Sequence, residues 1–284
     1  VNLGTSSRGT PLLVNRALME CDLKIGVGCI FPHPAAGFSG GSKIIMPAAC
    51  GAETIRCMHD YLRGAKQRGD SLDTEMRSEM EEVATKVGLN FVVNAVLNQR
   101  RQIAGLFVGN RNKAHRVGVQ FAIEHFSVNP VPDADIVVAD MYPFDLDLQF
   151  AYDRGFWPLL DAKKHVDRVV IAACTRGMGM HEFFPIAKPL WSRLSRRLQH
   201  FTLQDLSDPI TKLKTIKSVL AQKRMPMMML SQGIQAEELR EVLPRARLYN
   251  EWDEIVRELE HRHRGHAVRV AVYRSAPLLL PVCD

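Results

Sequence analysis

The spacing of apolar side chains along the 284-residue chain predicts a mixture of helices and short strands. Residues 74–87 place Met76, Met80, Val83 and Val87 on one face of a charged amphipathic helix. Thr10-Pro11 is predicted to open another helix, because Thr caps a helix and Pro suits its first turn. The other elements expected in the first half are a buried strand at 22–30, strands at 91–97 and 103–108, and helices at 42–49, 52–62 and 113–126.

The pattern of predicted elements changes after residues 130–133 (Pro-Val-Pro-Asp), the best linker candidate in the chain. Short apolar strands then alternate with helices, which is typical of a parallel sheet. Strands are expected at 136–139, 169–173, 227–230, 247–249 and 268–272, and helices at 149–160, 186–199, 209–222, 235–242 and 251–261. We therefore expect an α/β protein of two domains, the second a doubly wound, mainly parallel sheet. The expected boundaries are 1–130, 131–273 and a tail, 274–284, that returns to the first domain.

Composition narrows the class of protein. Apolar residues make up 46% of the chain and charged residues 24%, as in a globular protein. The net charge of +6 is scattered and has no aromatic ladder beside it, which argues against nucleic acid as a partner. No apolar run reaches the roughly 20 residues of a membrane span. Six cysteines without a C-x-x-C pair, and no signal peptide at the start, indicate thiols in a cytoplasmic protein.

The segment from Gly28 to Lys43 carries most of the candidate chemistry. His33 follows a predicted strand, a flexible loop containing Gly40 and Gly41 comes next, and Lys43 then stands at the expected start of a helix. His33 suits proton transfer near neutral pH, although a histidine after a strand is often structural. Lys43 suits a nucleophile, a phosphate contact or a solvated charge. The spacing fits neither a P-loop nor G-x-G-x-x-G, so these residues alone name no reaction.

His59 lies sixteen residues after Lys43, on the helix predicted at 52–62. An imidazole is a good ligand for a borderline metal such as nickel. A lone surface histidine is the competing interpretation.

Residues 3–11, the loop 32–43, Glu53-Thr54-Ile55 and His59 together resemble the nickel-dependent lactate racemase family. Both spacings, ten residues from His33 to Lys43 and sixteen from Lys43 to His59, are similar to that family's. The likeness continues more loosely through the second domain to Ala276-Pro277 and Pro281.

The resemblance implies a cofactor, the nickel-pincer nucleotide (pyridinium-3,5-bisthiocarboxylic acid mononucleotide with Ni). It implies that Lys43 is the covalent anchor, His59 the nickel ligand and His33 one of two acid/base residues. Residues 1–130 would then be the rest of a catalytic, cofactor-anchoring domain. Gly40 and Gly41 of the loop are also expected to contact the cofactor. Arg8 is expected either to contact a phosphate of the cofactor or to brace its own loop.

The resemblance also implies a reaction, racemisation or epimerisation of a small, lactate-like 2-hydroxy acid by hydride transfer to the cofactor. Its expected partners are that substrate and the cofactor-synthesis enzymes. In the second domain the family's Gln and Lys are replaced by Phe150 and Asp153. Gln149 and Arg154 stand one position away and are weak candidates for binding the substrate.

The family also carries a long N-terminal segment, with a second acid/base histidine and an arginine, ahead of the position where this sequence starts. An alternative is therefore a truncated, non-catalytic homologue or subunit that binds the nickel cofactor and needs that segment or a partner chain. A third possibility is a phosphate-binding α/β protein whose Lys43 is never modified. Without the segment, we expect the first domain to expose apolar surface.

Overall fold

The computed structural model describes residues 1–61, 72–163, 165–179 and 225–282. The chain folds into two compact units, each described here by itself. The first contains Val1–Asn129 together with the chain from Leu278 onward, and the second contains Pro130–Pro277.

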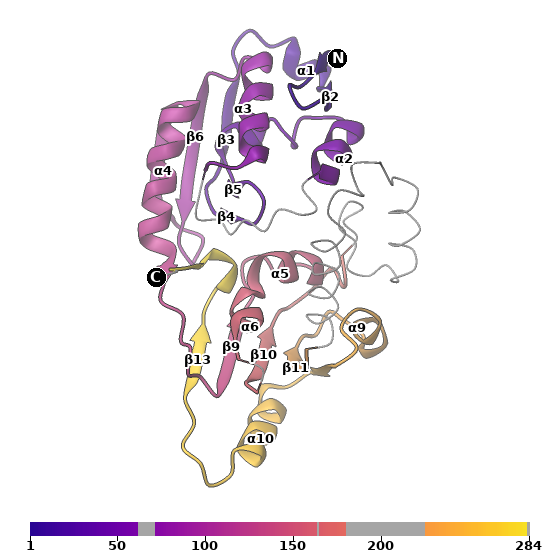
Figure 1. Cartoon of the computed structure of the whole chain (residues 1–284), viewed down its shortest axis with the longest axis vertical. Helices are drawn as coiled ribbons and strands as arrows, with labels where there is room; N and C mark the ends of the chain where they lie inside the picture. Colours follow the sequence, from indigo (N-terminus) through magenta and orange to yellow (C-terminus); the bar gives the residue numbers. More distant parts are fainter. Residues whose placement is uncertain (62–71, 164, 180–224, 283–284) are drawn as a thin grey trace, which may run out of the picture. The chain divides into compact units, whose positions relative to one another are not determined.

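The first unit is built on a three-stranded sheet in the order β3-β6-β7, with a parallel β3–β6 pair and an antiparallel β6–β7 pair. Helix α4 packs on β6 and β7 (Figure 1). Its strands are β1 (Asn2–Thr5), β2 (Pro11–Leu13), β3 (Ile25–Cys29), β4 (Pro32–His33), β5 (Gly37–Phe38), β6 (Phe91–Leu97), β7 (Ile103–Asn110), β8 (Ser127–Val128) and β14 (Leu280–Pro281). Its helices are α1 (Arg16–Met19), the 3-10 helix η1 (Gly41–Ile44), α2 (Ala52–Tyr61), α3 (Glu75–Val87) and α4 (Arg111–Phe126).

The two faces of this sheet have different surroundings. On the inner face Val92, Asn94 and Val96 of β6 are buried. Successive side chains of a strand point to opposite faces, so the alternate residues form the outer face. That outer face is apolar and open to solvent, with six large exposed side chains: Ile25, Val27, Phe91, Ile103, Leu106 and Val108. The strand expected at 22–30 is thus correct as a strand, but the expectation that it is buried is wrong for this face.

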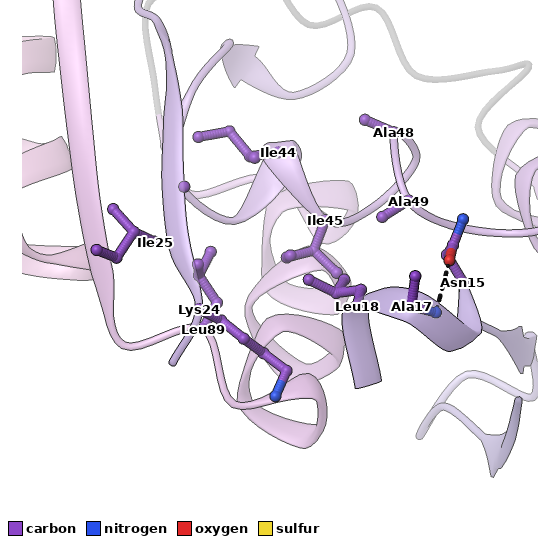
Figure 2. A pocket seen from close by; sticks show the side chains of 11 residues that line it. Asn15, Ala17, Leu18, Lys24, Ile25, Ile44, Ile45, Ala48, Ala49 and Leu89 are labelled. Carbon is purple, nitrogen blue, oxygen red and sulfur yellow. Dashed lines mark hydrogen bonds between the residues drawn. The ribbon is translucent and has the colours of Figure 1, made fainter. Parts of the chain in front are cut away.

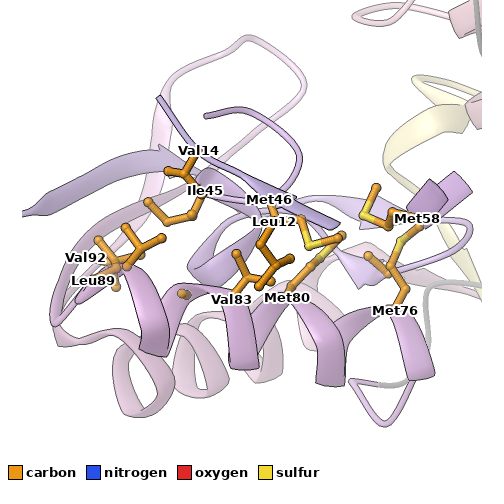
Figure 3. Packing of buried hydrophobic residues seen from close by; sticks show 13 residues of the cluster. Leu12, Val14, Ile45, Met46, Met58, Met76, Met80, Val83, Leu89 and Val92 are labelled. Atoms are coloured by element: carbon orange, nitrogen blue, oxygen red, sulfur yellow. The ribbon is translucent and has the colours of Figure 1, made fainter. Parts of the chain in front are cut away.

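One apolar core joins the elements that carry the candidate residues. It contains Ala36 from the hairpin β4–β5, Ile45 and Met46 after η1, Met58 from α2 and Met76 from α3. Figure 3 shows the methionines and Leu12 packed along the inner side of α3. Each of these side chains is at most 2% exposed. The hairpin, η1 and α2, which carry His33, Lys43 and His59, therefore pack with α3 around one interior.

Two helix predictions in the first half are wrong. Thr10-Pro11 begins the short strand β2, which pairs with β1, and the helix that follows is only α1, capped by the Asn15 side chain. The helix expected at 42–49 is the four-residue 3-10 helix η1 followed by turns. The remaining elements of this half lie close to their predicted ranges, including α3, whose N-cap is Thr74.

The second unit confirms the predicted α/β class. Its five strands lie in the order β12-β11-β10-β9-β13, and every pair is parallel. The strands are β9 (Ile136–Asp140), β10 (Asp167–Ile171), β11 (Met227–Leu230), β12 (Ala246–Tyr249) and β13 (Val270–Tyr273). The helices are α5 (Leu148–Gly155), α6 (Trp157–Asp161), α9 (Ala236–Val242), α10 (Trp252–Arg262) and the 3-10 helix η3 (Ala276–Leu278), which continues into the first unit.

The helix predicted at 149–160 is divided into α5 and α6 at Phe156. Pro158 lies in the first turn of α6, and because proline has no N–H it cannot continue the hydrogen-bond ladder of α5. The helices predicted at 186–199 and 209–222 lie outside the described residues.

Candidate functional site

His33 ends β4, and its ring is tied to the turn that follows. Its Nδ1 accepts hydrogen bonds from the backbone N–H groups of Ala35, at 3.2 Å, and Ala36, at 3.1 Å. A ring nitrogen that accepts hydrogen bonds carries no proton, so the neutral ring has its hydrogen on Nε2. The half-buried His33 therefore presents an N–H donor.

The glycine loop after His33 depends on left-handed backbone at Gly37, Gly40 and Gly41, with φ of 70°, 75° and 56°. Space is also restricted. A Cβ on Gly40 would lie 2.7 Å from Oδ1 of Asn94, and a Cβ on Gly41 would lie 2.8 Å from the ring of His115. Both positions therefore require glycine for conformation and for room.

Lys43 is half-buried and lies in the last turn of η1. The expectation that it begins a longer helix is wrong, so no helix N-terminus is available there to hold an anion. Two contacts fix its neighbours. Ser42 Oγ donates to Glu81 Oε2 at 2.6 Å, and the side chain of Ile44 lies over Gly28 of β3, where a Cβ would be 3.2 Å away.

Arg77 of α3 is a buried cation beneath the glycine loop, and sequence reasoning missed it. Its guanidinium donates to the carbonyl oxygens of Gly40 at 3.2 Å, Ala36 at 3.3 Å, and Phe38. Burial lowers the pKa of Arg77 to about 10, which leaves it charged at neutral pH. The sequence carried no local signal, because these partners lie 37 to 41 residues away.

His115 of α4 is the second missed residue. It is 3% exposed, and its Nε2 lies 2.8 Å from the carbonyl oxygen of Ser39. A carbonyl accepts only, so Nε2 is the protonated nitrogen. Burial, and then the charge of Arg77, lower the pKa of His115 to about 4, so the ring is neutral at neutral pH.

His59 lies on α2 beside the buried Met58, and it is itself half-buried. Its Nδ1 lies 2.7 Å from the carbonyl oxygen of Ile55, one helical turn earlier. Because that oxygen accepts, Nδ1 carries the hydrogen and Nε2 the lone pair. Such a backbone contact on one ring nitrogen is the usual way in which a metal-binding histidine is oriented.

Arg8 forms an ion pair with Glu75 of α3, with Nη1 and Oε2 3.1 Å apart. The same loop is bound to α3 through Ser6, which donates to Glu79 Oε1 at 2.5 Å, and Ser7, whose hydroxyl donates to Glu82 Oε2 at 2.6 Å. Of the two roles expected for Arg8, this geometry corresponds to bracing the loop.

The two substrate candidates, Gln149 and Arg154, are on α5 of the second unit. Gln149 is 2% exposed and its Nε2 donates to Asp153 Oδ2 at 3.0 Å. The guanidinium of Arg154 lies 5.5 Å from the ring centre of Phe144. Desolvation lowers the pKa of Arg154 to about 10, so it too stays cationic.

A pocket of about 400 Å³ in the first unit is lined in part by Ile44 of η1 (Figure 2). Its lining is mainly apolar, with Leu18, Ile25, Ile45 and Leu89. The candidate residues His33, Lys43 and His59 do not line it. In the ranges that the structure describes, no group of three His, Cys, Asp or Glu side chains is placed to hold a metal, and no helix is long and apolar enough to cross a membrane.

Comparison with known proteins relates the chain to lactate racemases. Residues 1–70, which include His33, Lys43 and His59, match a family model described as the lactate racemase N-terminal domain. The chain is 32% identical over 188 residues to a lactate racemase of Thermoanaerobacterium thermosaccharolyticum. In these comparisons the chain is similar to lactate racemases. It is also 31% identical over 190 residues to a lactate racemase of Lactiplantibacillus plantarum.

These matches cover 64% and 65% of this chain but 44% of each relative, so the aligned sequence spans less than half the length of those lactate racemases. The solved lactate racemase apoprotein from T. thermosaccharolyticum has the same fold, with a TM-score of 0.75 and 22% identity over 99% of this chain and 68% of that one. A Thermotoga maritima protein superimposes with a TM-score of 0.62 at 14% identity, over 97% of this chain and 70% of that one.

Proposed function

We propose that this chain is the cofactor-anchoring part of a racemase or epimerase of lactate-like 2-hydroxy acids, with a nickel-pincer nucleotide attached to Lys43. The observation that carries the proposal is that His33, Lys43 and His59 lie on elements sharing one core, inside the segment that matches the lactate racemase family. The activity belongs to relatives more than twice as long as the matched part, and here it is a proposal.

The residues present fit such a group. Lys43 supplies an amine at the end of a rigid loop, and His59 directs the lone pair of Nε2 away from its own backbone. A single imidazole suffices where the nucleotide provides the other nickel ligands. When bound, the group supplies an acceptor for the substrate hydride.

The chain's own residues would then bind and exchange protons. His33 offers Nε2–H as a hydrogen-bond donor to a substrate oxygen, and a proton can be taken up at Nδ1 only if the contacts with Ala35 and Ala36 open. Arg154 is a cation of the kind that a substrate carboxylate needs, and Gln149 lies on the same helix.

The test is attachment. The protein is expressed together with the cofactor-synthesis enzymes, and the peptide containing Lys43 is weighed by mass spectrometry. We expect added mass on Lys43 and none in Lys43→Arg, because a guanidinium keeps the charge but is a poor nucleophile. An unmodified Lys43 in a preparation that racemises a hydroxy acid would overturn the proposal.

A second candidate is a non-catalytic homologue or subunit that holds the cofactor and works with a partner polypeptide. The observation that favours it is again His33, whose only lone-pair nitrogen is already occupied by two backbone amides. The two candidates differ in turnover: both load Lys43, but only the first racemises a hydroxy acid.

A further inference from the structure

The backbone of residues 36–41 is held from beneath by side chains of three different elements. Arg77 comes from α3, Asn94 from β6 and His115 from α4. Each is buried, with exposed fractions of 4%, 0% and 3%. Such polar side chains are rare in an interior unless they have a defined partner, and here the partner is the loop.

The contacts alternate along the loop. Arg77 binds the carbonyl oxygens of residues 36, 38 and 40, and His115 binds that of Ser39. Asn94 completes the set by accepting from the Gly41 N–H at 3.2 Å. Four carbonyls and one amide of a six-residue stretch thus have fixed directions immediately before Lys43.

A buried guanidinium is unfavourable unless hydrogen-bond acceptors surround it. The loop carbonyls accept from Nη1 and Nη2 of Arg77, while its Nε has no partner among the described residues. The loop already closes through its own groups, because the Ser39 N–H donates to the carbonyl oxygen of Phe31 at 2.9 Å and the Ser39 hydroxyl to that of Cys29 at 2.7 Å. The buried charge of Arg77 and the imidazole of His115 are therefore additional to closure, and they act on the carbonyl groups between the closing contacts and Lys43.

We propose that Arg77 and His115 are positioning residues for Lys43. They fix the backbone of 36–41 and thereby the direction in which η1 presents the Lys43 amine. The inference rests on the proposed role of Lys43 as the cofactor anchor, but its first test needs no cofactor.

The first test measures amine reactivity in the full chain without cofactor. The rate at which an isotope-coded acylating reagent labels Lys43 is compared with the rates for Lys24, Lys86 and Lys113. In Arg77→Met, which keeps length without charge, and in His115→Phe, which keeps the ring without the donor, we expect the Lys43 rate to change at least about threefold through local opening of the loop. The other lysines should keep their rates.

Val83→Ala is the matched control, because Val83 is a buried residue of the same helix and core but contacts none of the loop carbonyls. It should lower stability and leave the Lys43 rate unchanged. Added guanidinium ion at low millimolar concentration should restore the wild-type rate in Arg77→Ala by filling the vacated space. If Arg77→Met does not fold, His115→Phe and this rescue still decide the matter.

The second test measures loading of Lys43 by mass in cells that make the cofactor. We expect Arg77→Met and His115→Phe to load less than wild type, and Val83→Ala to load normally. If wild type loads and both variants load and label as wild type does, or if Val83→Ala changes the Lys43 rate as much, the positioning role is wrong. If the labelling result is as expected but wild type never loads, the proposed function fails and the positioning role stands.

Discussion

At the scale of single residues, the two histidines that flank Lys43 are held in opposite tautomers. The turn after His33 donates to Nδ1 and so places the hydrogen on Nε2, whereas the carbonyl of Ile55 accepts from Nδ1 of His59 and leaves the lone pair on Nε2. At Nε2, His33 therefore carries an N–H and His59 a lone pair. The spacing in the sequence identified both histidines as candidates, but only their backbone contacts distinguish the N–H at Nε2 of His33 from the lone pair at Nε2 of His59.

The tautomers can be measured directly. In ¹⁵N-labelled protein near neutral pH, long-range imidazole spectra should show His33 protonated at Nε2 and His59 at Nδ1. A shared tautomer for the two rings would contradict the assignment of donor and ligand.

His59→Ala should lower nickel retention and leave the Lys43 adduct in place, as measured by metal analysis and peptide mass on the same sample. His125→Ala is the matched control. His125 makes the same contact with the carbonyl one turn earlier, at 2.7 Å from Phe121, but lies on the exposed side of α4. Unchanged nickel in His59→Ala would remove His59 from the site.

His33→Ala should keep its nickel and lose turnover by about 10²–10⁴-fold, the usual contribution of a proton-transfer group. Steady-state rates with a 2-hydroxy acid, measured on protein of known nickel content, give the comparison. A near-normal rate would show that proton transfer belongs to another residue.

At the scale of elements, the sequence predicts the apolar face of α3 correctly but does not reveal its buried charged residues. Its apolar face was predicted from spacing, and Met76, Met80 and Val83 are indeed buried. The charged residues of an amphipathic surface helix ordinarily face solvent, yet Arg77 and Glu79 are 4% and 1% exposed. Local periodicity cannot reveal them, because their partners are loops more than 30 residues away that fold onto the helix.

The helix predicted to open at Thr10-Pro11 is wrong for a related reason, since the structure has strand β2 there. Thr10-Pro11 has the local chemistry of a helix start, but Thr54 of α2 donates to the carbonyl oxygen of Pro11 and accepts from the N–H of Leu13, and pairing with β1 holds the segment extended. Tertiary contacts override a weak local preference. The α/β class, the sheet of the second unit and the Lys43 loop can be predicted from the sequence, whereas the residues that hold the loop cannot.

The packing of α4 against the loop makes stability depend on pH through His115. Its pKa of about 4 in the folded protein lies below the unfolded value near 6.5, so between these values only the unfolded chain binds the proton. Stability is therefore complete above about pH 6.5 and is lost as the pH falls toward 4, by up to about 3 kcal/mol.

Urea unfolding between pH 7 and 4.5 checks this expectation. His115→Gln keeps an N–H donor for Ser39 but does not titrate, so its midpoint should fall less steeply over that range. Parallel pH profiles for wild type and His115→Gln would show that His115 does not contribute.

At the scale of the whole molecule, the outer face of the β3-β6-β7 sheet gathers several exposed apolar side chains. Val27 of β3 is 72% exposed, and Ile103 and Leu106 of β7 are 65% and 56% exposed. They lie on one face of the sheet, with Phe91 of β6, itself 39% exposed, on the strand between them. Contiguous apolar surface of this kind favours association. The chain by itself should therefore bind hydrophobic dyes and aggregate at moderate concentration.

Val27→Lys should reduce dye fluorescence and raise the concentration at which light scattering begins. Val117→Lys is the matched control, because Val117 is 61% exposed on α4, away from this face, and the added charge is the same. Equal improvement in the two variants would mean that net charge, and not the face, governs solubility.

The same face also sets how the protein responds to cooling. Near room temperature the association of apolar surface is driven by the entropy of water, and it weakens as the temperature falls. Material that turns cloudy at 30 °C should clear at 4 °C without denaturant and cloud again on warming, unlike aggregates of unfolded chains, which persist in the cold. Purification and storage should accordingly succeed best on ice.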